Sequence, residues 1–129
     1  MSDGVTIADA SAILALLKQE PFDKVEPRRL FQSTISAVNL SEVLERLCAG
    51  GLGQLEADEA VAALNLRVAD FDAAQARLVA YMRPQTRCAG LSLGDRACLA
   101  LGLHLGCPVV TADRAWARVD VGVEIILIR

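Results

Sequence analysis

The stretch Val5-Thr6-Ile7-Ala8-Asp9 is a short apolar run that is rich in β-branched residues and ends at an acid. This composition predicts a buried β-strand, because β-branched side chains favour strands. The apolar residues 12–17 follow and predict a helix that ends before Pro21. A buried strand that leads into a helix is the repeating unit of α/β proteins, so this stretch predicts that class of fold.

The rest of the chain continues the alternation of strands and helices. Residues 56–81 are predicted to form two helices that meet near Ala69-Asp70. Strands that alternate with helices predict a small parallel sheet covered on both faces, a three-layer α/β/α sandwich. We expect one domain over residues 1–129. The other predicted elements are strands at 33–38, 109–111 and 123–128, helices at 39–49 and 92–105, and short helical turns at 28–32 and 114–118.

The composition limits the class of protein. Hydrophobic residues make up 53% of the 129 residues, which is enough for a core. No apolar run approaches the ~20 residues that span a bilayer, and the acidic N-terminus lacks the basic region of a signal peptide. We therefore expect a cytoplasmic protein without membrane contact. Reduced thiols are expected rather than a zinc site, because no Cys-x-x-Cys pair occurs. The residues concerned are Cys48, Cys88, Cys98, Cys107 and the single histidine, His104.

The formal net charge is −3, which by itself argues against a nucleic-acid-binding protein. If four acids share one metal site, however, the remaining residues carry a net charge of +1. All of the 13 basic residues except Lys18 and Lys24 are arginines, whose planar guanidinium group suits phosphate. The charge therefore does not exclude RNA as a substrate.

Four acids fall at the ends of predicted strands or at the starts of predicted helices. Asp9 follows the first strand and Asp113 the third, whereas Glu42 and Asp95 lie in the first turns of helices. Ligands of parallel sheets bind outside the carboxyl ends of the strands, so we expect the four carboxylates to converge at one edge. Clustered carboxylates without His or Cys ligands favour Mg²⁺ or Mn²⁺, ions that bind phosphate oxygens and activate water.

Each of these acids also has a purely structural interpretation. Asn39 with Glu42 and Ser92 with Asp95 fit capping boxes, and the other two acids could be helix caps themselves. Acids in a first helical turn also interact favourably with the helix dipole. Against this, charges in the apolar surroundings of these acids are costly unless they are paired or bind a metal. The residue pattern by itself leaves both interpretations open.

Four motifs, taken in order, resemble those of PIN-domain nucleases: IADASA (7–12), ISAVNLSEV (35–43), LSLGDRA (91–97) and VTADRAW (110–116). In length and motif order the chain is similar to VapC-type toxins of bacterial toxin–antitoxin pairs. The resemblance implies a three-layer α/β/α fold and Mg²⁺- or Mn²⁺-dependent cleavage of cellular RNA, with structured RNA such as tRNA as the expected substrate. It also implies a homodimer and a cognate antitoxin protein that blocks the active site.

The same resemblance assigns roles by motif position. Asp9, Glu42, Asp95 and Asp113 match the catalytic acids of the family. Asp9 and Asp95 would be the most direct metal ligands. Glu42 and Asp113 would hold a water molecule on the ion or a second ion, which makes Asp113 a metal residue as well. Hydroxyl positions that support the ligands or the phosphate are occupied by Ser11 and Thr111.

Two other classes of protein fit part of the pattern. An aspartyl-phosphate phosphatase needs a second Asp two residues after its nucleophile and a downstream Lys. Here Asp9 is followed by Ala10-Ser11, and no Lys follows Lys24. The same argument excludes a phosphoacceptor signalling domain. The remaining alternative is a non-catalytic acidic α/β binding module whose acids are helix caps, and metal binding would distinguish it from the nuclease.

Overall fold

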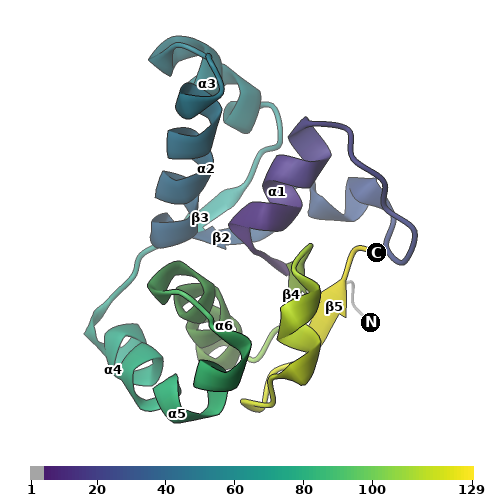
Figure 1. Ribbon diagram of the computed structural model, residues 1–129. Helices are drawn as coiled ribbons and strands as arrows, with labels where there is room; N and C mark the ends of the chain where they lie inside the picture. The colour runs from purple at the N-terminus through teal and green to yellow at the C-terminus, as the bar shows by residue number, and fades with distance from the viewer. Residues whose placement is uncertain (1–4) are drawn as a thin grey trace.

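Five parallel strands form the centre of the structure, a computed structural model that describes residues 5–129 (Figure 1). The strands lie in the order β3-β2-β1-β4-β5, so that β1 is in the middle of the sheet. Ile7 of β1 is paired with Thr34 of β2 on one side and with Val109 of β4 on the other. The strands are β1 (Ile7–Ala8), β2 (Thr34–Ser36), β3 (Arg67–Ala69), β4 (Val109–Thr111) and β5 (Ile125–Leu127).

Helices cover both faces of this sheet. Ala8 packs into an apolar cluster with residues of α1 and α2, whereas Ile7 packs into a second cluster with residues of α4 and α6. Successive side chains of a strand point to opposite faces, so the two clusters lie on the two sides of the sheet. The predicted three-layer α/β/α sandwich is therefore confirmed (Figure 1). The α-helices are α1 (Ala10–Leu17), α2 (Ala37–Ala49), α3 (Gln54–Ala62), α4 (Ala73–Tyr81), α5 (Arg83–Thr86) and α6 (Leu93–Leu105), and the 3₁₀-helices are η1 (Pro27–Leu30), η2 (Arg87–Ala89) and η3 (Arg114–Arg118).

The prediction that residues 56–81 are helical throughout is wrong. The strand β3 lies between α3 and α4 and pairs with β2, with Arg67 opposite Thr34. It is one of the two edge strands of the sheet, with β5 at the other edge. It is exposed at Arg67 and Val68, so its sequence lacks the buried apolar pattern of β1 and β4. Asn65, whose φ of 53° is left-handed, lies in the turn that separates α3 from this strand.

The start of α2 also differs from the prediction. The helix begins at Ala37, and its cap is Ser36, whose Oγ accepts a hydrogen bond from the Val38 amide at 3.2 Å. Asn39 is therefore an internal residue of the helix rather than its cap, and Glu42 lies in the second turn instead of the first. In contrast, the capping box of α6 is present as predicted. Within residues 5–129, no helix is long and apolar enough to cross a membrane.

Candidate active site

The four acids singled out in the sequence line one cavity of about 310 Å³ beside the carboxyl ends of the strands. Asp9 directly follows β1, and Asp113 lies two residues beyond β4. Glu42 comes from α2, which follows β2, and Asp95 from the first turn of α6. The structure thus brings all four acids to the same edge of the sheet. The cavity is lined by Asp9, Ala10, Ser11, Leu14, Glu42, Arg46, Ser92, Asp95 and Asp113.

Asp9 is the buried acid of the four, with 3% of its surface exposed. Its Oδ2 accepts two hydrogen bonds, from Ser11 Oγ at 2.6 Å and from Thr111 Oγ1 at 2.9 Å. The two hydroxyl groups are fixed in turn by the backbone, because Ser11 Oγ accepts from the Ala112 amide and Thr111 Oγ1 accepts from the Asp113 amide. Ser11 of α1 and Thr111 of β4 therefore hold the Asp9 carboxylate in place.

Burial raises the pKa of the Asp9 carboxyl group from its ordinary value of 3.8 to about 6. The neighbouring charges of Asp95 and Glu42 raise this pKa as well, so both carboxylates lie within electrostatic reach of Asp9. The hydrogen bonds from Ser11 and Thr111 lower the pKa, because they stabilise the charged form. The charged site therefore contains like-charge repulsion that a bound cation would relieve.

Glu42 is held by a buried asparagine and a glycine. Asn39 is fully buried, and its Nδ2 donates to Glu42 Oε1 at 2.9 Å and to the Gly94 carbonyl at 3.0 Å. The Glu42 carboxylate lies against the Cα of Gly94, where any other residue would place a Cβ 2.6 Å from Glu42 Cδ. The sequence paired Asn39 with Glu42 only as a capping box and gave no role to Gly94, because Asn39 and Gly94 are far apart in the chain and only the fold brings them together.

Asp95 and Asp113 are caps as well as cavity residues. Asp95 Oδ2 accepts from the Ser92 amide at 2.9 Å, completing the capping box of α6, and Asp113 Oδ1 accepts from the Ala115 amide at 2.9 Å at the start of η3. Each of the four carboxylates thus uses one oxygen for local hydrogen bonds. The second oxygen of each accepts no hydrogen bond from residues 5–129; these atoms are Asp9 Oδ1, Glu42 Oε2, Asp95 Oδ1 and Asp113 Oδ2.

The donor set can be tested against a divalent cation. Four carboxylates around one cavity are the oxygen ligands that Mg²⁺ and Mn²⁺ prefer, and a cation would offset the charges of Asp95 and Glu42, which add to the effect of burial on the pKa of Asp9. In the part of the chain that is described, however, no three acidic, His or Cys side chains lie close enough together to hold an ion. The residue types therefore suit such an ion, but their carboxylates lie further apart than the ligands of a bound metal.

Of three other polar or titratable residues on α2 and α6, only Arg46 lines the cavity. Arg46 lies one helical turn after Glu42 on α2 and adds a positive charge to the cavity lining, a role that the sequence pattern did not predict. Cys98 is fully buried in α6, and burial raises the pKa of its thiol, as do the charges of Asp9, Asp95 and Glu42. His104 is exposed near the end of α6 and does not line the cavity, so it supplies no base there.

Comparisons with known proteins agree with this geometry. A family model described as PIN domain matches residues 6–122. The fold is similar to that of VapBC from Salmonella typhimurium bound to DNA, with a TM-score of 0.73 and 21% identity over 94% of this chain and 96% of that chain. It is also similar to VapBC2 from Rickettsia felis bound to a promoter DNA fragment, with a TM-score of 0.72 and 14% identity over 95% and 97% of the two chains.

A third similar structure is VapC20 from Mycobacterium tuberculosis, described as a sarcin-ricin loop cleaving toxin. Its TM-score is 0.64, with 16% identity over 88% of this chain and 92% of that chain. No curated protein sequence matches the chain at a significant level. At these identities the structures establish the fold, and the family model covers nearly the whole sequence. The chain therefore belongs to the PIN domain family.

Proposed function

We propose that residues 1–129 form one nuclease domain, a divalent-metal-dependent endoribonuclease that acts in the cytoplasm as the toxin of a toxin–antitoxin pair. The observation that carries this proposal is the set of four carboxylates around one cavity, each with one oxygen held and one free. Such an arrangement has no protein nucleophile but suits hydrolysis in which a metal ion assists.

Asp9, Asp95 and Asp113 would hold Mg²⁺ or Mn²⁺ through their free oxygens, and Glu42 would complete the catalytic set. When bound, the ion supplies charge stabilisation for the phosphodiester and lowers the pKa of water. Asp9 fits the central position because Ser11 and Thr111 fix one of its oxygens and direct the carboxylate. Glu42, which Asn39 holds through its Oε1, would accept a proton from the attacking water.

The positive charge at the rim gives the substrate a second contact. Arg46 lines the same cavity as the acids, and its guanidinium group can bind a phosphate next to the cleaved bond. This contact would offset the repulsion between the carboxylates and the RNA backbone. The relative described as cleaving the sarcin-ricin loop supports RNA as the substrate, and we propose a structured RNA such as tRNA.

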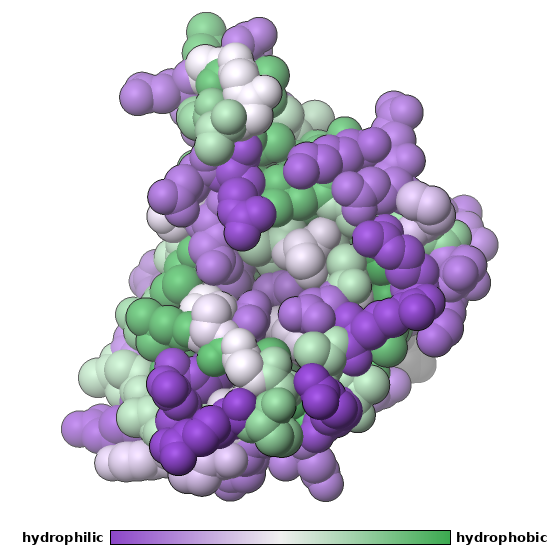
Figure 2. Space-filling model, in the orientation of Figure 1, coloured by the Kyte–Doolittle hydropathy of each residue, from purple (hydrophilic) through white to green (hydrophobic). Residues whose placement is uncertain are grey.

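The similar VapBC structures contain toxin–antitoxin pairs, which supports a cognate antitoxin as partner. Figure 2 shows apolar surface beside α1, where Leu16 and Leu17 are only partly buried. Leu14 of the same helix lines the acidic cavity. An antitoxin that covers this surface could therefore insert a basic side chain, which we expect to be Arg, among the four carboxylates.

We also propose a homodimer with an apolar helical interface. Leu55 of α3 and Tyr81 of α4 are each 71% exposed, and Leu93 of α6 is 59% exposed. A second copy of the chain packed against these helices would remove such side chains from water, which stabilises association. Light scattering at micromolar concentration should give the mass of two chains, and a monomer mass would contradict this assembly.

The test of the proposed activity is cleavage of total cellular RNA by the purified chain, with mapping of the cleaved sites. Mg²⁺ or Mn²⁺ should support cleavage and EDTA should stop it. Glu42→Gln should remove nearly all activity, whereas Glu45→Gln, which makes the same change on an exposed position of α2 outside the cavity, should retain it. Equal cleavage by wild type and Glu42→Gln in contaminant-controlled preparations would refute the proposal.

A non-catalytic acidic binding module is a second candidate, because Asp95 and Asp113 do act as helix caps. Its acids would have no preference for metal. Thermal unfolding separates the two candidates: Mn²⁺ should raise the melting temperature of the wild-type nuclease by more than it raises that of the Asp9→Asn variant, since the ion binds the folded site. A capping protein would show no such difference.

A further inference from the structure

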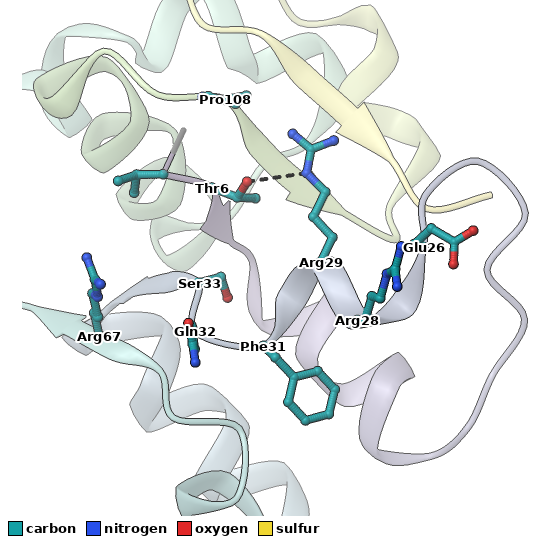
Figure 3. A pocket seen from close by; sticks show the side chains of 10 residues that line it. Thr6, Glu26, Arg28, Arg29, Phe31, Gln32, Ser33, Arg67 and Pro108 are labelled. Atoms are coloured by element: carbon teal, nitrogen blue, oxygen red, sulfur yellow. Dashed lines mark hydrogen bonds between the residues drawn. The ribbon is translucent and has the colours of Figure 1, made fainter. Parts of the chain in front are cut away.

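A second and larger cavity, of about 1030 Å³, lies beside the amino ends of the strands, opposite the acidic cavity (Figure 3). Its floor is formed where the strands begin, with Thr6 before β1, Ser33 before β2 and Pro108 before β4. Thr6 and Asp9 are three residues apart, so along the strand the two cavities are separated by roughly 10 Å. The lining residues that carry the argument are Thr6, Glu26, Arg28, Arg29, Phe31 and Arg67.

The lining is basic. Arg28 and Arg29 come from η1 and Arg67 from the edge strand β3, and Glu26 is the one acid among the lining residues. Within residues 5–129 none of these three guanidinium groups forms an ion pair with a carboxylate. The cavity therefore has a net formal charge of +2 that no described side chain neutralises.

The arginines are arranged across the cavity rather than side by side. Figure 3 shows Arg29 and Arg67 on opposite sides, with Thr6 and Ser33 between them. Arg29 Nε donates to Thr6 Oγ1 at 3.4 Å, and Thr6 is 94% buried, so this hydroxyl anchors the side chain. The two terminal nitrogens form no hydrogen bond with residues 5–129. Two guanidinium groups on either side of a polar floor give a cavity that suits a phosphodiester.

An aromatic side chain completes the lining. Phe31 follows η1 and is 47% exposed, although a large apolar side chain gains stability from burial. Exposed aromatic rings beside arginines are a common platform for unpaired bases, because a base can stack on the ring while its phosphate binds the guanidinium group. A small inorganic anion would use neither the ring nor most of the volume.

We propose that this cavity binds an unpaired nucleotide of an RNA chain, with the phosphate between Arg29 and Arg67 and the base on Phe31. This inference rests on the proposed ribonuclease function for its biological meaning, since it gives the enzyme a second contact with its substrate. Two contacts at opposite edges of the sheet select an RNA that reaches both. The site thus contributes to the choice of substrate without touching the reacting atoms.

Binding of a short single-stranded RNA to the full-length Asp9→Asn variant in EDTA tests the site apart from cleavage. The double change Arg29→Gln/Arg67→Gln should weaken binding about tenfold or more and reduce its dependence on salt. Phe31→Leu should weaken binding about tenfold without changing the salt dependence. The matched control is Arg77→Gln/Arg83→Gln, which removes two exposed arginines of α4 and α5 outside the cavity and should have little effect.

Several outcomes would overturn the inference. One is that the control pair Arg77→Gln/Arg83→Gln weakens RNA binding as much as Arg29→Gln/Arg67→Gln does. Another is that the Arg29→Gln/Arg67→Gln variant binds as wild type does while its melting temperature is normal. A third is that an abasic oligonucleotide binds as tightly as the RNA. Displacement of the RNA by an acidic peptide at similar concentration would assign the cavity to protein instead. If wild type cleaves RNA but these variants bind normally, only this site is refuted. If no cleavage occurs but binding needs Arg29 and Arg67, the site stands and the ribonuclease proposal fails.

Discussion

The Cα of Gly94 in α6 lies against the carboxylate of Glu42 in α2, and a Cβ at residue 94 would come within 2.6 Å of Glu42 Cδ. Gly94→Ala should therefore displace Glu42 and lower kcat about 10- to 100-fold, because small misplacements in an active site have large effects. Cleavage assays well below the melting temperature measure this loss. Gly53→Ala, where a Cβ meets only ordinary contacts, is the matched control and should retain activity.

The same contact can be tested without an activity assay. Alanine normally stabilises a helix relative to glycine by up to ~1 kcal/mol. In the Glu42→Ala background, Gly94→Ala should raise the free energy of unfolding by about this amount, whereas in the wild type it should not. Urea unfolding of the wild type, the two single variants and the double variant gives the coupling free energy between residues 42 and 94. Additive effects would show that the two residues do not constrain each other.

Asn39 is expected to position Glu42 rather than to react. Asn39→Ala removes the donor to Glu42 Oε1 and the Gly94 carbonyl, so the free energy of unfolding should fall by about 1–3 kcal/mol. Activity per folded molecule should also fall. Val43→Ala, a fully buried position nearby on α2, is the control: it should cost stability but leave kcat close to that of the wild type. Equal kcat for both variants would contradict the positioning role.

The raised pKa of Asp9 predicts a specific pH dependence of stability in EDTA. The folded chain holds this proton up to a pKa of about 6, whereas the ordinary value is 3.8, so the free energy of unfolding falls as the pH rises through this window. Above it, the charged Asp9 costs about 3 kcal/mol. Asp9→Asn should therefore melt about 5–10 °C higher than wild type at pH 7.5.

Thermal scans across pH check this sign. The advantage of Asp9→Asn should shrink as the pH falls towards 4, because protonation then neutralises the wild-type residue as well. Mn²⁺ at neutral pH should reduce the advantage too, by stabilising the wild type. A variant that melts below wild type at pH 7.5 in EDTA would show that burial of the charge is not costly.

The proposed antitoxin should act through charge as well as shape. Its inserted Arg would bind one of the cavity carboxylates, so Arg→Gln in the partner should weaken the complex and restore part of the RNA cleavage. Combining that change with Asp95→Asn should have less effect than the sum of the single changes. Complex formation that altered neither Mn²⁺ affinity nor cleavage would exclude this mode of inhibition.

The buried elements of the fold could be predicted from the sequence, and the exposed edge could not. The apolar strands β1, β4 and β5 have a strong composition signal, whereas β3 contains an arginine and exposes both Arg67 and Val68. Its existence depends on pairing with β2, a long-range contact that no local pattern encodes. The flanking helices α3 and α4 made continuous helix the simpler prediction.

The acids could be predicted because each follows a strand or lies near the start of a helix, and because four motifs occur in the order typical of the family. Their supports could not all be predicted in the same way. Asn39 fits a helix cap by local pattern, but Ser36 takes that position and leaves Asn39 facing Gly94, which is 55 residues away in sequence. Arg46 belongs to the cavity only because α2 places it there. These roles depend on tertiary packing, and a motif carries no signal for them.

The double use of Asp95 has a consequence for the evolution of the chain. Asp9 makes the folded protein less stable at neutral pH, whereas Asp95 also completes the capping box that starts α6. Changes at these two positions should therefore affect stability in opposite directions. Loss of the Asp9 charge should raise the free energy of unfolding, and loss of the Asp95 side chain should lower it. A selection for harmless chains that still accumulate in the cell should recover replacements at residue 9 more often than at residue 95.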